Sequence, residues 1–270
     1  DLYRNNQLVK ANKDLDYDQI TMDYTREARS FIQENSNKPF FLYMAHSAIH
    51  IPLYASPQFR RHEGFRGLYQ DMTEELDWSC GEIVKELEKH GILDNTIVIF
   101  TWEAGFRVPL IVRWPEKIKA GSVSHELATM MDFYPTIAKI VGAKVSKERA
   151  IDGHNILPLL TGDTAKSEYE FLCYYGRDGK LAAIRQGDWK LHLAEPSERW
   201  AGKQPVEEAL LNTRPTTALP WLYNLSTDIG ETKNVESAHP DVVEKLRKTA
   251  ASFDATLDAQ LRPKYGTEKR

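Results

Sequence analysis

The chain has 270 residues, of which 41% are hydrophobic and 27% charged, and its formal net charge is −4. This length and composition are typical of a globular protein with one large domain or two smaller ones. The small negative charge gives no electrostatic basis for binding nucleic acid, and no apolar run approaches the roughly 18 residues of a membrane span.

The chain begins DLYRNN, without a start Met or a basic-then-apolar leader, and we interpret it as a mature product or an internal fragment. Its two cysteines, Cys80 and Cys173, lie far apart in the sequence and have neither C-x-x-C nor zinc-site spacing. We therefore expect two unpaired, buried thiols rather than a metal or redox site.

The first part of the chain alternates predicted helices and strands. Apolar spacing predicts a helix over 16–35 and another over 68–90 that ends at Gly91. Apolar or β-branched runs predict buried strands over 38–44, 96–100 and 108–114. Asp132 is expected to cap a further helix that stops at Gly142. This rhythm predicts a largely parallel α/β sheet.

From about residue 168 the pattern changes to short strands separated by turns. Strands are predicted over 171–175, 181–185, 189–193 and 221–225. The stretch 195–220 has no clear period and is expected to be a long loop, whereas 241–257 has the spacing of a helix that packs on the sheet. The sequence thus predicts a boundary near 165, which divides the chain into 1–165 and 166–270.

The stretch KPFFLYMAHSAIHIPLY indicates a chemical site. His46 and His50 follow the predicted strand where it should end, and Pro52 closes off regular structure. Ligands bind at the carboxyl ends of strands in open α/β sheets. Imidazole side chains suit that position because they bind anions or move protons near neutral pH.

Several segments, in order from about Leu2 to Leu246, resemble the arylsulfatase-type sulfatases, which are formylglycine-dependent enzymes of the alkaline-phosphatase-like superfamily. They are KPFFLYMAHSAIHIPL, RGLYQDMTEELDWSCGEIVKELEKHGILDNTIVIFT, TWEAGFRVPLIVRWPEKIKAG, ATMMDFYPTIAKIVGA, IDGHNILPLLTG, AAIRQGDWKLHL and WLYNLSTDIGETKNV. The resemblance covers only the second half of a sulfatase. It implies the late part of a catalytic domain with a mostly parallel sheet and flanking helices, then a small α+β domain with a four-stranded antiparallel sheet and a helix.

The resemblance also implies a reaction, the hydrolysis of an aryl or carbohydrate sulfate ester. Such enzymes use a formylglycine made from a Cys or Ser in a Cys/Ser-x-Pro-x-Arg motif, together with Ca²⁺ bound by Asp and Asn side chains. Family members usually work outside the cytoplasm, so a periplasmic, secreted or lysosomal location is expected. A small-molecule or glycan sulfate ester is the expected partner, with no nucleic acid.

One matching element assigns a catalytic residue. His-x-Pro-Leu corresponds to His50-Ile51-Pro52-Leu53, so the resemblance implies that His50 contacts sulfate or protonates the leaving alcohol. The structural alternative is a histidine bonded to backbone at a strand end. His46, Trp102 and His154 are candidate substrate-binding residues, with a supporting or packing role open for each.

Other parts of the expected site are absent from the sequence. No Cys/Ser-x-Pro-x-Arg motif occurs, and Thr101 runs straight into Trp102 where the family has its Asp-Asn calcium pair, so no metal ligand is assigned. The seven residues from Thr101 to Arg107 are also too few to cross over between parallel strands. Three explanations stay open. Residues between Thr101 and Trp102 exist in the protein but are left out of this sequence, or the chain is a genuine fragment or internally deleted form, or it is a degenerate, non-catalytic relative. We expect the chain to be inactive without the missing N-terminal half of the catalytic domain.

Two alternative functions stay open. A phosphodiesterase or phosphonate hydrolase of the same superfamily would use a different metal-ligand set, and a non-catalytic relative would bind sulfated glycans without turnover. Acidic residues on the predicted helix over 68–90 are attributed to a solvated face. They are Asp71, Glu74, Glu75 and Asp77.

Overall fold

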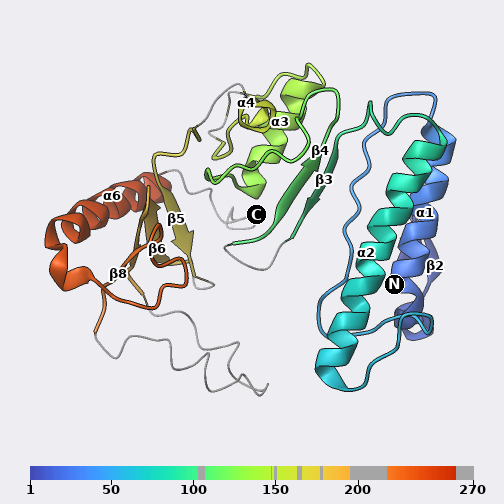
Figure 1. The fold of residues 1–270 in the computed structure, drawn as a ribbon, viewed down its shortest axis with the longest axis horizontal. Helices are drawn as coiled ribbons and strands as arrows, with labels where there is room; N and C mark the ends of the chain where they lie inside the picture. The colour runs from blue at the N-terminus through green and yellow to red at the C-terminus, as the bar shows by residue number, and fades with distance from the viewer. Residues whose placement is uncertain are drawn as a thin grey trace, which may run out of the picture. The chain divides into compact units, whose positions relative to one another are not determined.

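The computed structural model describes residues 1–102, 107–146, 148, 151–162, 166–176, 179–194 and 218–259. The chain divides into two compact units, one formed by the described residues up to 102 together with 108–122, and the other by Arg107 and the described residues from 123 onward. Figure 1 shows the helices and strands of each unit. The predicted domain boundary near 165 falls inside the second unit and stays a prediction.

Two helices that pack side by side and run in the same direction dominate the first unit, since Thr25 contacts Ser79 and Arg29 contacts Glu86. They are α1 (Ile20–Asn35) and α2 (Gly64–Lys89), which lie side by side in Figure 1. The guanidinium of Arg29 joins them by donating to Glu82 at 2.9 Å and to Glu86 at 3.0 Å. As predicted, Gly91 directly follows the C-cap of α2; its φ of +69° suits glycine, and its N–H donates to the Glu88 carbonyl at 2.9 Å.

Short elements complete the first unit. An exposed hairpin that was not predicted, β1 (Leu2–Arg4) with β2 (Gln7–Lys10), precedes two 3₁₀ turns, η1 (Asn12–Asp14) and η2 (Tyr17–Gln19). Further on, β3 (Val98–Thr101) pairs with β4 (Leu110–Arg113).

The predicted strands near 96–100 and 108–114 are confirmed, but their pairing is not parallel. Val98 lies opposite Arg113 and Thr101 opposite Leu110, which is an antiparallel register. The connection between these strands is too short for a crossover, so the chain turns back. Within the described residues every strand pair is antiparallel, and the predicted parallel sheet is not found there.

The predicted buried strand over 38–44 is wrong for this structure. The segment belongs to no sheet, and the side chains of Phe41 and Tyr43 are 68% and 73% exposed. Phe40 packs edge-on against Phe31 of α1, with ring centroids 5.7 Å apart. The physical reason is that no strand in the described residues lies beside the segment to pair with it.

The second unit opens with a capped helical turn. A 3₁₀ turn, η3 (Met130–Asp132), leads into α3 (Phe133–Ile140). Asp132 holds the N-cap position of α3, as predicted, but its side chain makes no cap hydrogen bond to that helix. It instead accepts from the Thr129 N–H and completes a capping box in which Thr129 caps η3. The stop at Gly142 is confirmed by its φ of +71°.

A four-stranded antiparallel sheet with a covering helix forms the rest of the second unit, as predicted. Its strands pair in chain order: β5 (Leu172–Tyr175), β6 (Leu181–Gln186), β7 (Trp189–His192) and β8 (Trp221–Asn224). The short η5 (Glu236–Ala238) precedes α6 (Pro240–Ala259), which packs against β6 and β7.

The core of this sheet unit consists of fully buried aliphatic side chains. They are Ile184, Leu191, Leu222, Leu246 and Ala250. The predicted loop over 195–220 lies outside the described residues up to 217. None of the described helices is both long enough and apolar enough to cross a membrane. Both cysteines are free and half-buried, so the prediction of unpaired thiols is confirmed.

Candidate active site

Three polar side chains of α2 hold the segment that carries His46 and His50. Asp71, Glu75 and Ser79 recur every four residues, which places them on one face of the helix. All three are buried, with exposed fractions of 0%, 1% and 0%. Their partners lie in the stretch 46–62, which runs along this face.

Asp71 fixes the end of that stretch. Its Oδ2 accepts the backbone N–H groups of Arg61 at 3.0 Å and His62 at 3.1 Å, and its Oδ1 lies 2.6 Å from the His62 Nδ1. Burial opposes the charged form, but the hydrogen bonds from His62 and Arg61 outweigh it and lower the pKa of the Asp71 carboxyl. The carboxylate is therefore charged, and both of its oxygens are hydrogen-bonded to Arg61 or His62.

Glu75 fixes the middle of the stretch. Its Oε2 accepts the Ser56 N–H at 2.9 Å, and burial raises the pKa of Glu75. The expectation of a solvated acidic face is thus wrong for Asp71 and Glu75. A carboxylate can be buried on a helix when it satisfies the backbone N–H groups of a neighbouring loop, as these two do.

His46 is a half-buried, neutral imidazole. Its Nε2 lies 3.3 Å from the Ser79 Oγ, which is 2.6 Å from the Thr25 Oγ1. Burial lowers the pKa of His46 to about 4, so the ring is uncharged near neutral pH. Its Nδ1 is buried and has no hydrogen-bond partner in the described part of the chain. A neutral ring can orient a neighbour but gives no charge to bind an anion.

His50 is exposed and anchored at one nitrogen. Its Nδ1 lies 2.7 Å from the carbonyl oxygen of Ile51. A carbonyl only accepts, so Nδ1 is the donor, and Nε2 is left as a base in the neutral ring or as a proton donor in the charged ring. The bond to backbone matches the structural alternative, but the second nitrogen and the exposure of the ring leave His50 able to act on a ligand.

Trp102 follows β3 directly and is half-buried. The strand end before it is fixed because the Thr101 hydroxyl donates to the Pro109 carbonyl at 3.0 Å. Trp102 and the two histidines therefore all belong to the first unit, whereas His154 belongs to the second.

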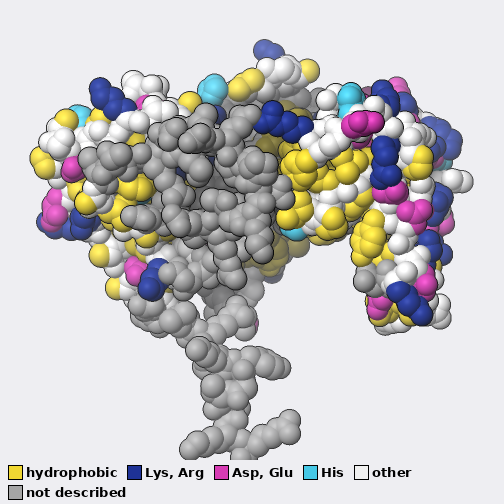
Figure 2. All heavy atoms as spheres, turned by 90° about the horizontal axis from the view of Figure 1, so that it is seen from below, with side chains coloured by type: hydrophobic (Ala, Val, Ile, Leu, Met, Phe, Trp, Pro, Cys, Tyr) yellow, Lys and Arg dark blue, Asp and Glu magenta, His cyan; other side chains and the backbone are white. Residues whose placement is uncertain are grey.

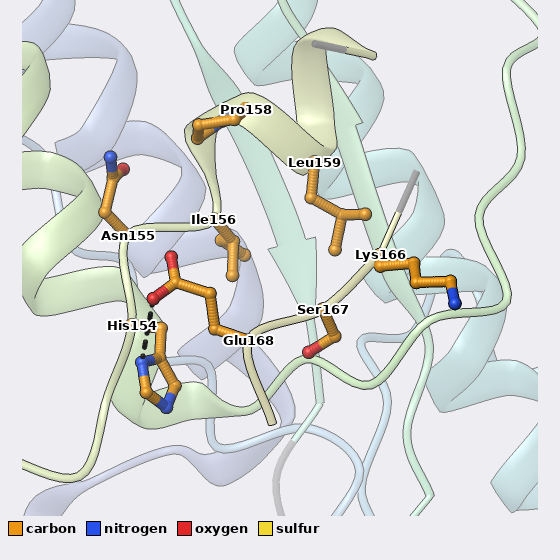
Figure 3. Close-up of a pocket in the computed structure, with 8 residues that line it drawn as sticks. All are labelled: His154, Asn155, Ile156, Pro158, Leu159, Lys166, Ser167 and Glu168. Atoms are coloured by element: carbon orange, nitrogen blue, oxygen red, sulfur yellow. Dashed lines mark ion pairs between the residues drawn. The ribbon is translucent and has the colours of Figure 1, made fainter. Parts of the chain in front are cut away.

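His154 lines a small pocket with Asn155, Lys166 and Glu168 (Figure 3). Its Nδ1 faces the Glu168 carboxylate at 3.5 Å, and its ring meets Tyr169 edge-on with centroids 4.5 Å apart. This arrangement presents a polar imidazole at a surface pocket.

A buried carboxylate that sequence reasoning missed as a site anchor positions His154. The Asp132 Oδ1 accepts the backbone N–H of His154 at 2.7 Å and the hydroxyl of Tyr169 at 2.6 Å. Burial and this hydrogen bond raise the pKa of Tyr169. Gly153 is needed beside them, because a Cβ there would lie 2.1 Å from the Met131 carbonyl oxygen. The Asp-Gly pair of IDGHN was the available sequence sign of this close approach.

The described residues do not offer a metal site. They contain no group of three His, Cys, Asp or Glu side chains placed to hold a metal ion. The Ca²⁺ expected from the resemblance therefore finds no ligand set in this part of the chain.

Three family models match the chain in succession. They are "Sulfatase" over residues 1–101, "N-sulphoglucosamine sulphohydrolase, C-terminal" over 88–200, and "C-terminal region of aryl-sulfatase" over 167–266. Together they extend over nearly the whole sequence.

Curated relatives give the same picture. The chain is 30% identical to the steryl-sulfatase of Mus musculus over 96% of this chain and 49% of that protein. It is 34% identical to the N-acetylgalactosamine-6-sulfatase of Mus musculus (78% of this chain, 48% of that protein) and 31% identical to the N-acetylgalactosamine-6-O-sulfatase of Bacteroides thetaiotaomicron (84% and 50%). The chain thus spans about half the length of the curated relatives it matches.

Solved structures share the fold. A structure from work on glycosaminoglycan metabolism by Bacteroides thetaiotaomicron matches with a TM-score of 0.72 and 28% identity, over 89% of this chain and 55% of that chain. A sulfatase from Pseudoalteromonas matches with a TM-score of 0.73 at 22% identity, over 92% and 56%, which compares the folds alone.

Proposed function

This chain belongs to the sulfatase family, and from that premise we propose that it forms the second half of an enzyme that hydrolyses an aryl or carbohydrate sulfate ester. The succession of three sulfatase family models along one chain is the observation that carries the proposal. A glycan sulfate is favoured by the names of two relatives that act on N-acetylgalactosamine sulfates and by a related structure holding k-i-k-neocarrahexaose.

His50 is the acid in this proposal. Hydrolysis breaks the bond between sulfur and the ester oxygen, and the departing alkoxide needs a proton. The charged His50 ring can give the Nε2 proton to that oxygen while Nδ1 stays bonded to the Ile51 carbonyl. The buried stripe of Asp71, Glu75 and Ser79 limits movement of the segment that presents the ring.

The remaining chemistry is assigned to residues outside this chain. In the complete enzyme a formylglycine would supply the nucleophile and Ca²⁺ would polarise the sulfate oxygens. The other half of the sulfatase length would carry both, and the complete polypeptide would work outside the cytoplasm, in the periplasm, the lysosome or the medium. His46, Trp102 and His154 are proposed as substrate neighbours within this chain's share of the site.

The test of His50 uses the complete polypeptide, with the other half preceding this chain. His50→Ala should lower kcat by about 10²–10⁴-fold on an alkyl or sugar sulfate. The loss should be much smaller on 4-nitrocatechol sulfate, whose leaving group needs no proton. His125→Ala, at an exposed histidine, is the control and should leave both rates unchanged. Equal losses on both substrates would contradict proton donation, and faster hydrolysis of phosphodiesters than of sulfates would favour the phosphodiesterase alternative.

A further inference from the structure

The two histidines of the candidate site lie at different places on one loop. His46 is half-buried where the loop begins, whereas His50 is exposed farther along it. Tyr54 closes the loop by donating a hydrogen bond to the Ser47 hydroxyl. Apolar side chains between these two residues pack against a core that includes Met72 of α2. The inner side of the loop is therefore held, and its outer side presents His50.

A chain of hydrogen bonds leads from α1 through α2 to His46, and the direction of each bond can be assigned. The Thr25 hydroxyl donates its single proton to the Thr21 carbonyl at 2.7 Å, because a carbonyl only accepts. Thr25 must therefore accept from the Ser79 hydroxyl, which lies 2.6 Å away. Ser79 has then used its own proton, so it accepts from the His46 Nε2–H at 3.3 Å. This order of donors fixes the proton of the neutral His46 ring on Nε2.

The two imidazole rings are thus held in opposite tautomers. The His46 Nε2–H is bonded to α2, and its buried Nδ1 has no partner in the described part of the chain. His50 carries its proton on Nδ1, which donates to the Ile51 carbonyl at 2.7 Å. One ring uses its proton to hold the loop, and the other keeps Nε2 available for a ligand.

The hydroxyl groups of this chain lie in the interior of the first unit. Thr25 and Ser79 are only 1% and 0% exposed. Figure 2 shows that Lys and Arg side chains (dark blue) and Asp and Glu side chains (magenta) are interspersed over the surface of the same unit. Water does not replace a hydrogen bond lost in such an interior, so the loss leaves a buried polar group unsatisfied.

We propose that His46 is a positioning residue for the reaction, which ties the loop that presents His50 to α1 and α2 through Ser79 and Thr25. Its Nε2–H is the last donor of a chain that starts on the backbone of α1, so a shift of the loop would break a buried hydrogen bond. The ring acts as a neutral donor, and its effect on the reaction passes through the position of His50. This role rests on the proposed function, because it matters for turnover only if His50 is the acid.

Nitrogen NMR of the 270-residue chain tests the hydrogen-bond chain without reference to turnover. The histidines are labelled with ¹⁵N and observed at about pH 8, where both rings are neutral. His46 should then show a protonated Nε2, and His50 a protonated Nδ1. The signals that disappear in His46→Gln and in His50→Ala assign the two rings. A protonated Nδ1 at His46, or an even mixture of tautomers, would overturn the proposal.

Two amide variants separate the Nε2 donor from the rest of the ring. His46→Gln places an amide N–H₂ where Nε2 lies and keeps a donor to Ser79, whereas His46→Asn places it near the position of Nδ1 and leaves Ser79 without one. In the 270-residue chain, His46→Asn should shift the ring signals of His50, and His46→Gln should leave them nearly unchanged. Unchanged His50 signals in His46→Asn would overturn the positioning role.

Turnover of a sulfated sugar by the complete polypeptide measures the consequence for the reaction. Ser79→Ala and His46→Asn should each lower kcat by about 10–100-fold with little change in KM, because the loop then presents His50 less accurately. The double variant should be no slower than the slower single variant, since both changes remove the same hydrogen bond. His46→Gln should recover most of the rate. Thr73→Ala, at an exposed hydroxyl of α2, is the matched control and should leave the rate unchanged.

Three kinetic results would overturn the proposal. They are losses that multiply in the double variant, a His46→Gln rate as low as that of His46→Asn, and a rise in KM confined to the His46 variants, which would show direct contact with the substrate. A complete polypeptide that hydrolyses no sulfate ester but shows the expected ring signals would contradict the proposed function and leave the positioning of His50 by His46 standing.

Discussion

The two units differ in how completely they cover their apolar residues. In the second unit, Ile184, Leu191 and Leu222 are fully buried between the four-stranded sheet and α6. In the first unit, Phe41 and Tyr43 stay exposed between half-buried neighbours. The second unit thus contains the apolar groups that its core needs. The described residues of the first unit leave these aromatic side chains uncovered, and the same unit carries the candidate catalytic histidine.

The largest expected effect lies in the second unit. Leu222→Ala should lower the free energy of unfolding by about 3–4 kcal/mol, because it leaves a cavity in a closed core. Ile229→Ala, at a residue that is 55% exposed in the same unit, should cost less than about 0.5 kcal/mol. Urea unfolding followed by tryptophan fluorescence measures both. A loss below 1 kcal/mol for Leu222→Ala would mean that this core is not closed and would remove the contrast between the units.

A smaller effect is expected in the first unit at the anchor of the His50 segment. Asp71→Asn replaces one carboxylate oxygen by an amide N–H₂, which would face backbone N–H groups that now donate to the carboxylate. The substitution should lower the free energy of unfolding by roughly 2–3 kcal/mol. Asp77→Asn, on the exposed face of the same helix, should be nearly neutral. Amide exchange of α2 and of the stretch 56–62 in the 270-residue chain measures the change. Equal effects of the two substitutions would contradict the anchoring role of Asp71.

The smallest effect concerns the pH dependence of the first unit. Burial lowers the pKa of His46 from 6.5 to about 4, so the unfolded chain takes up this proton first as the pH falls. The contribution of His46 to the free energy of unfolding is therefore fully present above pH 7. It declines as the pH falls from 6.5 toward 4 and changes no further below that. The expected loss between pH 7 and pH 5 is about 1–2 kcal/mol. His46→Gln does not titrate, so its free energy of unfolding should fall by about 1–2 kcal/mol less over this pH range. Amide exchange of α1 and α2 measures the difference. An identical pH dependence in both proteins would contradict a neutral His46 in the folded state.

Sequence reasoning found the parts of the molecule that depend on local pattern. The strands of the second unit were predicted from period-two alternation and glycine turns, and Gly91 and Gly142 from the positive φ that helix ends require. The segment Phe40–Met44 was predicted as a buried strand because its pattern is that of one. A pattern shows which faces are apolar, but it does not show whether the covering residues belong to the same chain.

The candidate site was predicted less completely for a related reason. His50 could be singled out because His-x-Pro-Leu is a local motif. The roles of Asp71, Glu75 and Asp132 could not be predicted, since each accepts a backbone N–H from a loop that lies 9 to 22 residues away in the sequence and outside its own helix or turn. On a helical wheel a buried anchoring carboxylate and a solvated one look alike.

The central claim is that this chain is one half of a sulfatase and needs the other half for its site. Its most direct test is sulfate release from 4-nitrocatechol sulfate and from a sulfated sugar, measured with Ca²⁺ for the 31.0 kDa chain alone and for the complete polypeptide. The account predicts no release by the chain alone and turnover by the complete polypeptide. Turnover by the 31.0 kDa chain itself, abolished by His50→Ala, would contradict it.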